Sequence, residues 1–391
     1  MKTLIELYDS KNTIDNILAS YIFQPDQVVF LCDGSPKNLA GVKELQWAFK
    51  EKFPQMAFSY TFLRNSQQVP QVCERLISLY PDPVFDLTGG RDSISFAVAQ
   101  FCHQRVRPCI CIDWQEKEIL CSEAAQEYKD SFFMPQLTIN DILRANGATA
   151  CRSMHQTPSK ERYNALTEFF EETLRRPREW HSFCRYLQQT AAQAQREGHP
   201  LTIQGNGVIY ERGGKMLQCH PDFARLALKL GFFTQLEMRK TQVSLTFADE
   251  TMLRYLTSQG TWLELYVYII AKQSGRFHDC QMSVVIDWDG VFQKRDNVVN
   301  EIDVMLMRGI RPVFISCKTS VPTTENLNEI ELYAKKLGGS QAVAMLVTTT
   351  DVQKEAPIVA ERAEELDVIL VERDQLLEKN GLLHLMERIR G

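Results

Sequence analysis

Two apolar runs near the C-terminal end of the sequence each carry a charged residue where strand packing alone would not place one. They lie in the stretch NEIDVMLMRGIRPVFISCKTS, residues 300–320. The first run contains Asp303, and the second ends at Lys318, two residues after Ser316. If the runs are strands that pair through the short turn between them, Asp303 and Lys318 meet near one end of a sheet.

Side chains alternate between the two faces of a strand, and this alternation predicts which residues share a face. In the first run Glu301 and Asp303 are expected on one face. The opposite, packing face is expected to hold Ile302, Val304 and Leu306. In the second run Ser316 and Lys318 share a face, and Cys317 points the other way. The acidic face is therefore separate from the packing face.

A third charged residue, Glu264, lies in a helical pattern that is apolar nearly all round, GTWLELYVYII. A buried carboxylate without a partner is costly, so Glu264 is expected to meet a metal ion or Lys318. Hydrolysis of a phosphodiester needs carboxylates that hold Mg²⁺ or Mn²⁺ and a positive group near the developing charge. Glu264, Asp303 and Lys318 supply these groups. The alternative is an ion pair between Asp303 and Lys318 without catalysis.

The N-terminal part of the sequence contains two loops suited to an anionic ligand. The loop LTGGRDS, residues 87–93, runs directly into a helical pattern, and YDSKNT, residues 8–13, follows the first predicted strand. Glycines allow close approach of the backbone, and a helix N-terminus presents free N–H groups. The expected ligand-binding residues are Ser10, Lys11, Asn12, Thr88, Gly89, Gly90, Arg91 and Asp92. The alternative is a tight turn capped by Thr88; neither loop matches a dinucleotide or P-loop fingerprint.

The order of predicted elements divides the chain into three parts. Residues 1–122 alternate short apolar strands with helices, which indicates a mostly parallel sheet covered on both faces. Residues 123–250 contain long helical patterns at 160–175 and 178–196 and a predicted β-ribbon at 201–219. They are interpreted as a helical connector with a candidate winged-helix-like unit. Residues 251–391 predict a helix over 252–272, three strands with a turn at Asp289 and Gly290, and then alternating helices and strands. The expected fold class is α/β throughout.

Composition narrows the functional classes. A hydrophobic content of 44% and a net charge of −5 are typical of a globular protein and exclude a general polyanion binder. No apolar run reaches the roughly 20 residues that span a bilayer, and the first residues do not resemble a secretory signal. The 11 cysteines form no CxxC pair, so Cys109 and Cys111 are expected to be packing residues. Asp33 and Gly34 are expected to form an ordinary turn. The expected location is the cytoplasm.

The motifs together carry a family resemblance. GTWLE, NEIDV and PVFISCKTS, on helix, strand and strand in that order, resemble the PD-(D/E)xK restriction-endonuclease-like nuclease fold. FDLTGGRDS in a Rossmann-like N-terminal domain resembles a CARF domain. The chain is therefore similar to CRISPR-associated ancillary nucleases in which a CARF sensor is fused to such a nuclease, with the middle segment less diagnostic.

The resemblance implies a cyclic oligoadenylate, expected to be cyclic tetra-adenylate, that binds across a CARF homodimer and activates metal-dependent cleavage of nucleic acid in type III CRISPR antiviral defence. It makes Asp303 the first acid of the motif, Lys318 its lysine and Glu264 the helix-borne acid. Ser316 occupies the place of the second acid, and the candidates to compensate for it are Glu301, Glu264 and, on the following helix, Glu329. The carbonyl of Cys317 would join Glu264 and Asp303 as a metal ligand.

These patterns predict an allosterically activated endonuclease that uses Mn²⁺ or Mg²⁺ and forms a homodimer. Its expected substrate is single-stranded DNA or RNA, with duplexes also allowed, because the motif serves both nucleic acids. The rival hypothesis is a ligand-sensing regulator whose degenerate nuclease-like domain binds nucleic acid or a partner without cleaving, and Ser316 keeps that hypothesis open. The sequence offers no group that stands out as a base for degradation of the ligand by the N-terminal domain.

Overall fold

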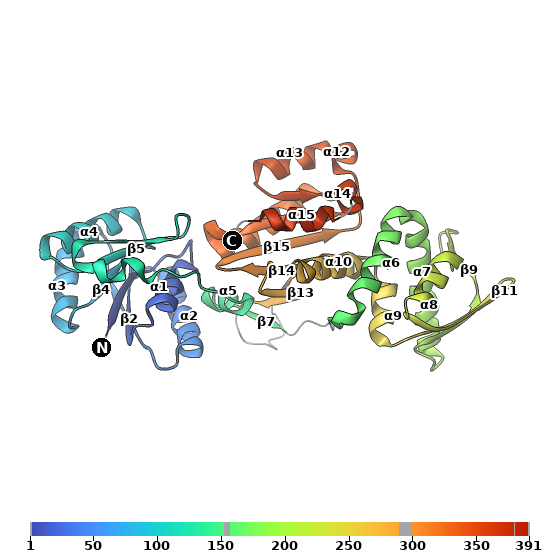
Figure 1. The fold of residues 1–391 in the computed structure, drawn as a ribbon, viewed down its shortest axis with the longest axis horizontal. Helices are drawn as coiled ribbons and strands as arrows, with labels where there is room; N and C mark the ends of the chain where they lie inside the picture. Colours follow the sequence, from blue (N-terminus) through green and yellow to red (C-terminus); the bar gives the residue numbers. More distant parts are fainter. Residues whose placement is uncertain (1, 152–156, 289–298, 379, 390–391) are drawn as a thin grey trace.

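The computed structural model describes residues 2–151, 157–288, 299–378 and 380–389, and it contains three main sheets. Figure 1 shows them arranged along the long axis of the molecule: the N-terminal sheet at one end, the C-terminal sheet in the middle, and the middle segment of the sequence at the other end. The order in space therefore differs from the order in sequence. The part that joins the two α/β regions along the chain does not separate them in the fold.

The N-terminal sheet is parallel except at one edge. Its strands follow the order β3-β2-β1-β4-β5-β6, and only β5 and β6 pair antiparallel. The strands are β1 (Thr3–Leu7), β2 (Gln27–Cys32), β3 (Ala57–Phe62), β4 (Val84–Asp86), β5 (Cys109–Asp113) and β6 (Glu118–Cys121). The helices are α1 (Asp15–Phe23), α2 (Pro36–Lys52), α3 (Val69–Leu79) and α4 (Asp92–Arg105). The strand order reverses between β1 and β4, which is where open α/β sheets bind ligands.

Most of the middle segment forms a small winged-helix-like unit. Its helices are α6 (Tyr163–Arg175), α7 (Pro177–Arg196), α8 (Pro221–Lys229) and α9 (Glu250–Thr257). The earlier helix α5 (Ile139–Ala145) lies apart from this unit and packs against α2 and the C-terminal sheet. Its strands are β8 (Thr202–Asn206), β9 (Val208–Tyr210), β10 (Met216–Gln218), β11 (Phe233–Arg239) and β12 (Gln242–Phe247). The predicted ribbon over 201–219 is wrong in its first part, because β8 pairs with β12 and only β9 and β10 pair with each other. Buried Ile203 of β8 packs in one core with Val243 and Leu245 of β12, which favours that distant pairing.

The C-terminal sheet has the order β17-β16-β15-β14-β13-β7. Its strands are β7 (Thr149–Cys151), β13 (Asp279–Asp287), β14 (Val299–Arg308), β15 (Arg311–Lys318), β16 (Val343–Thr348) and β17 (Ile369–Val371). Its helices are α10 (Gln259–Ser274), α11 (Thr324–Gly338), α12 (Val352–Glu355), α13 (Pro357–Glu365), α14 (Arg373–Leu377) and α15 (Gly381–Arg388). The edge strand β7 comes from the segment predicted as a connector, and it pairs with β13.

Two details of this region differ from the sequence predictions. The helix predicted over 252–272 is broken at Ser258, whose side chain accepts a hydrogen bond from the N–H of Thr261 and so begins α10 as a separate helix. The turn predicted at Asp289 and Gly290 lies outside the described residues. None of the helices that the structure describes combines the length and the apolar character needed to cross a membrane.

The predicted packing face of β14 is also wrong. Ile302 packs in a different hydrophobic cluster from Val304 and Leu306, although strict alternation would place all three together. The paired residues of the neighbouring strand β13 are divided in the same way. Met282 lies in the cluster of Val304, and Val284 lies in that of Ile302. Between them Ser283 has a φ of +50°, a left-handed conformation that is unusual for serine. The alternation of side chains therefore switches at Ser283.

Candidate functional site

Asp303 and Lys318 meet at the end of the strand pair β14 and β15, as predicted from their positions in the two runs. The Lys318 Nζ lies 3.8 Å from Asp303 Oδ2, with the two side chains 30% and 20% exposed. The same carboxylate oxygen accepts a 2.6 Å hydrogen bond from the backbone N–H of Cys317 and a 3.4 Å hydrogen bond from the hydroxyl of Ser316. Three donors thus fix one carboxylate oxygen. Burial nevertheless raises the pKa of Asp303, and these donors oppose that rise.

Glu264 reaches the same site from α10. Burial raises the pKa of Glu264 to about 7, and the nearby Asp303 carboxylate adds to the rise. The Ser283 hydroxyl donates a 3.0 Å hydrogen bond to Glu264 Oε2, which opposes it. Ser283 was not predicted as a site residue, because the left-handed backbone that places it there has no signal in the residue pattern. Glu264 and Asp303 therefore form a half-buried pair of like charges.

A small pocket joins Asp303, Ser316 and Lys318 to α11. Its wall also contains Glu301, and Glu329 and Tyr333 line it from α11. The Tyr333 hydroxyl donates a 3.1 Å hydrogen bond to Glu329, and the Glu329 carboxylate raises the pKa of Asp303 slightly. Of the three residues named as possible substitutes for the missing second acid, Glu301 and Glu329 line this pocket and Glu264 does not. Ser316 itself contributes a hydroxyl, and its side chain is 8% exposed.

The residues of this site fit a hard divalent cation, although Ser316 stands where the motif would have its second acid. Within the described ranges, no group of three His, Cys, Asp or Glu side chains is arranged to hold a metal. Two desolvated carboxylates that repel each other are, however, a favourable environment for a divalent cation. Mg²⁺ is commonly bound by one or two carboxylates and keeps several of its waters. Glu264 and Asp303 would supply the carboxylates.

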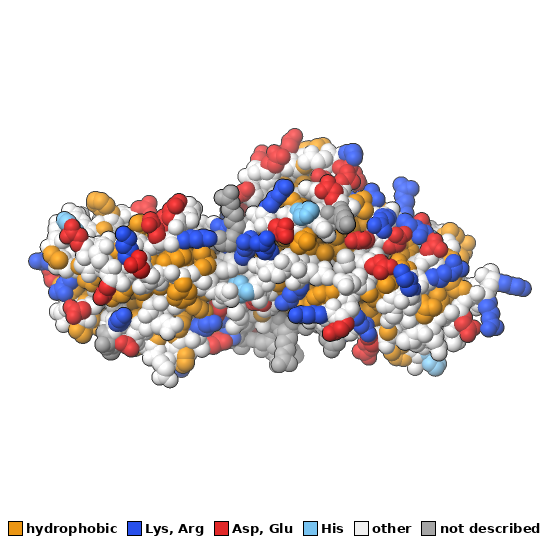
Figure 2. All heavy atoms as spheres, viewed as in Figure 1, with side chains coloured by type: hydrophobic (Ala, Val, Ile, Leu, Met, Phe, Trp, Pro, Cys, Tyr) orange, Lys and Arg blue, Asp and Glu red, His pale blue; other side chains and the backbone are white. Residues whose placement is uncertain are grey.

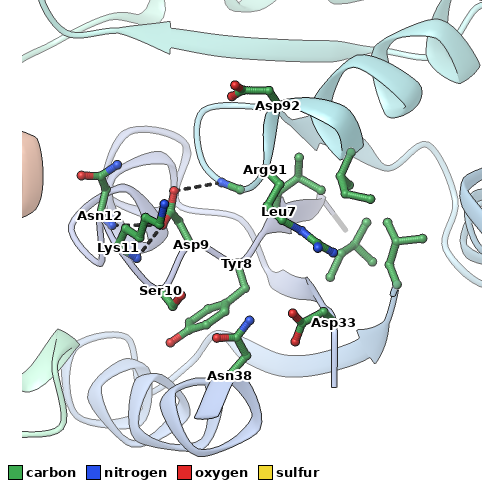
Figure 3. Close-up of a pocket in the computed structure, with 14 residues that line it drawn as sticks. Leu7, Tyr8, Asp9, Ser10, Lys11, Asn12, Asp33, Asn38, Arg91 and Asp92 are labelled. Carbon is green, nitrogen blue, oxygen red and sulfur yellow. Dashed lines mark hydrogen bonds between the residues drawn. The ribbon is translucent and has the colours of Figure 1, made fainter. Parts of the chain in front are cut away.

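The N-terminal site is a pocket of about 520 Å³ at the carboxyl ends of β1, β2 and β4 (Figure 3). Six of the eight predicted ligand-binding residues line it: Ser10, Lys11, Asn12, Gly90, Arg91 and Asp92. Thr88 and Gly89 do not. The Thr88 hydroxyl accepts a hydrogen bond from the N–H of Ile112, and the Cα of Gly89 faces the carbonyl of Leu7, where an added Cβ would lie only 3.0 Å away. These two residues form the base of the loop.

Four polar residues of this pocket were not predicted as ligand-binding: Tyr8, Asp9, Asp33 and Asn38. Asp33, expected in an ordinary turn, faces the pocket in Figure 3, and the backbone N–H of Ser35 lowers the pKa of its carboxyl. Asp9 organises both loops: it accepts hydrogen bonds from the N–H groups of Lys11 and Asn12 and, at 3.3 Å, from that of Gly90. The loops after β1 and β4 are thereby held together.

The two sites are connected through one hydrogen bond. Asn12 of the N-terminal pocket accepts a 3.0 Å hydrogen bond from the N–H of Ser340, directly beyond the C-terminal end of α11. The preceding Gly339 has a φ of +56°, and an added Cβ there would lie 2.5 Å from the Asn12 side chain. The middle of α11 carries Glu329 and Tyr333 of the C-terminal pocket. At about 1.5 Å per residue, the part of α11 from Glu329 to its C-terminal end at Gly338 spans roughly 14 Å between the two sites.

Comparisons with known proteins find one matching family model and several solved structures with a similar fold. Residues 249–388 match the family model of the Card1-like endonuclease domain. A search of curated proteins gives no match. Among solved structures, protein VC1899 from Vibrio cholerae is 16% identical, with a TM-score of 0.75 over 99% of this chain and 97% of that one. Can2 from Sulfobacillus thermosulfidooxidans, in complex with cyclic tetra-adenylate, is 19% identical, with a TM-score of 0.70 over the full length of both chains.

The fold as a whole is a Rossmann-like N-terminal domain followed, after the middle segment, by a C-terminal α/β domain with a mixed sheet. The predicted fold class is confirmed, since the architecture of the whole chain is that of Can2. More specifically, the chain carries a Card1-like endonuclease domain at residues 249–388, and Glu264, Asp303, Ser316 and Lys318 all lie within it.

Proposed function

We propose that this protein is a metal-dependent nuclease of type III CRISPR defence, activated when cyclic tetra-adenylate binds to the N-terminal domain. The observation that carries the proposal is the convergence of Glu264, Asp303 and Lys318 inside a Card1-like endonuclease domain. The fold shared with the Can2 complex, which holds cyclic tetra-adenylate, supports the choice of activator. DNA and RNA are both proposed as substrates, because a site built on carboxylates and a lysine can act on the phosphodiester that the two nucleic acids share.

Each residue of the C-terminal site has a role that follows from its contacts. Glu264 and Asp303 would hold Mn²⁺ or Mg²⁺, with the carbonyl of Cys317 as a further ligand. The cation, when bound, supplies Lewis-acid activation of the scissile phosphate. Lys318 is placed to stabilise negative charge that develops on the phosphate oxygens. The N–H of Cys317 and the hydroxyl of Ser316 keep Asp303 in position.

The N-terminal pocket is suited to a polyanionic ligand. Lys11 and Arg91 provide positive charge, and the N-terminal end of α4 lies at Asp92. Arg91 is already oriented, since its guanidinium donates a 2.9 Å hydrogen bond to the carbonyl of Arg64. A cyclic ligand with two-fold symmetry would contact the same loops twice in a two-fold homodimer, so we propose that the active form is a homodimer.

Activation is proposed to pass through Asn12 and α11. A ligand that displaces the loop 9–12 changes the hydrogen bond to Ser340, and α11 transmits a shift to Glu329 and Tyr333 beside Asp303. A ligand changes such an equilibrium only by its different affinities for the two states. The loop belongs to the ligand pocket and contacts α11 directly, so the two states can differ at both sites.

The test is a cleavage screen with the full-length protein. Single-stranded and double-stranded DNA and RNA are incubated with Mn²⁺ or Mg²⁺, with and without cyclic tetra-adenylate. We expect cleavage of at least one substrate that depends on the activator and is lost in Asp303→Ala and Lys318→Ala, with binding of the activator retained. Absence of activated cleavage for every substrate would refute the proposal and favour a regulator that binds without cutting.

A further inference from the structure

A second pocket lies beside the catalytic residues, on the side where β15, β16 and β17 end. Thr319 and Thr349 line it directly after β15 and β16, and Arg373 lines it at the start of α14, two residues after β17. Helices α6, α7 and α10 close the opposite side, with Trp180 from α7 and Trp262 from α10. The carboxyl ends of three adjacent parallel strands thus open into one cavity, which is a common position for ligands in α/β sheets.

This cavity lies next to the proposed catalytic site. Thr319 follows Lys318 in β15, and Leu263, another lining residue, precedes Glu264 in α10. The N–H of Thr349 donates a 3.2 Å hydrogen bond to the carbonyl of Lys318. Lys318 lines the pocket that holds Asp303, whereas Thr319, directly after the end of β15, lines this cavity. The cavity therefore lies across the end of β15 from the pocket that holds Asp303.

The chemistry of the cavity favours an anion. None of its lining residues is acidic, and they include the Arg373 guanidinium, two threonine hydroxyls, His181 and Gln259. Arg373 donates a 3.1 Å hydrogen bond from Nη2 to the carbonyl of Leu174, but its buried Nε has no acceptor among the described residues. The buried indole N–H of Trp262 also lacks an acceptor in the described part of the chain. Buried donors without partners are costly unless a ligand or water satisfies them.

The positive charge of Arg373 is available to a ligand. The Asp351 carboxylate interacts with Arg373, but its pKa is lowered mainly by the hydrogen bond from Lys354 and only slightly by Arg373. Asp351 also caps α12, so its carboxylate already has other partners. The cavity has a volume of about 80 Å³. Since roughly 10 to 15 Å³ is needed for each water, it has room for several waters or for a phosphate group.

We infer that this cavity binds a backbone phosphate of the nucleic-acid substrate, next to the phosphate that is cleaved. The inference rests on the proposed nuclease function and names a part of its substrate site. Figure 2 shows positive and negative side chains intermingled over the visible face of the molecule, with no broad basic band there. Phosphate contacts fix the register of a strand on a protein. Arg373 is accordingly a positioning residue, which sets the place of the strand relative to Lys318.

The test compares Arg373→Gln and Arg373→Lys with wild type in the full-length protein, using a substrate that wild type cleaves. We expect Arg373→Gln to raise KM about tenfold and to leave kcat within about twofold. Binding of a labelled oligonucleotide is then measured at several salt concentrations in the Lys318→Ala background. Loss of one phosphate contact should lower the slope of log affinity against log salt by about 1. Arg373→Lys keeps the charge and should keep the slope.

Arg362→Gln is the matched control, because it removes one arginine from α13 of the same domain, at a site that does not line the cavity. Its KM and salt slope should equal those of wild type. If Arg373→Gln lowers only the melting temperature, Arg373 supports the contact with Leu174 and the inference is wrong. Unchanged KM and slope would overturn it equally. If wild type cleaves nothing but its oligonucleotide binding still depends on Arg373, the phosphate site stands and the proposed nuclease function fails.

Discussion

Replacement of Glu264 by glutamine should make the metal-free protein more stable while it removes activity. The side chains are nearly the same size, and a glutamine oxygen can still accept the hydrogen bond from Ser283. Wild-type Glu264 has a pKa of about 7 in the folded protein, against an ordinary value of 4.5. At 1.36 kcal/mol per tenfold change in proton affinity, this difference corresponds to at most about 3 kcal/mol.

How the stability difference between Glu264→Gln and wild type depends on pH follows from the upward shift of the Glu264 pKa. Below pH 4 the carboxyl is protonated in both the folded and the unfolded chain, so the substitution should change the free energy of unfolding little. Between pH 4.5 and about pH 7 the unfolded chain loses this proton while the folded chain keeps it, so stability falls over that range, and above pH 7 the folded chain holds a desolvated negative charge beside Asp303. The advantage of Glu264→Gln should therefore grow to its full size by pH 8.

The measurement is urea unfolding at pH 4, 6 and 8 in EDTA, for wild type, Glu264→Gln and the control Glu361→Gln on an exposed turn of α13. Mn²⁺ should then stabilise wild type at pH 8, by about 2.7 kcal/mol at 100 times the dissociation constant, and Glu264→Gln by less. A glutamine variant that is less stable than wild type at pH 8 in EDTA would refute the reasoning, because it would show that Glu264 has a cationic partner within the protein.

Two further variants test the connection and the composition of the site. Asn12→Leu removes the acceptor for Ser340, and since one hydrogen bond contributes about 0.5–1.5 kcal/mol, activation by cyclic tetra-adenylate should fall roughly two- to tenfold. Asn12→Asp keeps an acceptor and should retain activation; equal activation of both variants at saturating ligand would exclude this route. Ser316→Asp restores a second acid 3.4 Å from the Asp303 carboxylate and should lower the Mn²⁺ concentration for half-maximal cleavage on the order of tenfold. Ser316→Asn, without the charge, should not, and an unchanged metal requirement in Ser316→Asp would mean that Ser316 lies outside the metal site.

Local patterns were enough to predict the elements of the catalytic site. The order of the two strands and the short turn between them place Asp303 beside Lys318, and the apolar surroundings of Glu264 predict that its carboxylate is buried, which the structure confirms. The Gly-Gly loop and the loop after β1 likewise lie in one pocket, because parallel strands end at the same edge. Each of these predictions depends only on the pattern of side chains along one helix or strand and on the element that lies next to it.

Features that depend on distant parts of the chain could not be predicted. Asn12 and Ser340 are 328 residues apart, and neither lies in a pattern that identifies the other. The left-handed conformation of Ser283 reverses the faces of two strands without a glycine to indicate it. Arg373 follows a short strand whose neighbours are known only when the sheet order is known. In each case tertiary packing decides a position that local propensity leaves open.

The pairing of β7 with β13 limits how the protein can be divided. The matched endonuclease domain begins at residue 249, but the edge of its sheet is completed by residues 149–151. A fragment that starts at residue 249 would leave the backbone N–H and C=O groups of β13 unpaired along Val285, Ile286 and Asp287. Such an exposed edge is a template for strand addition between copies. The excised domain should therefore self-associate or precipitate, and a soluble fragment would have to begin before β7.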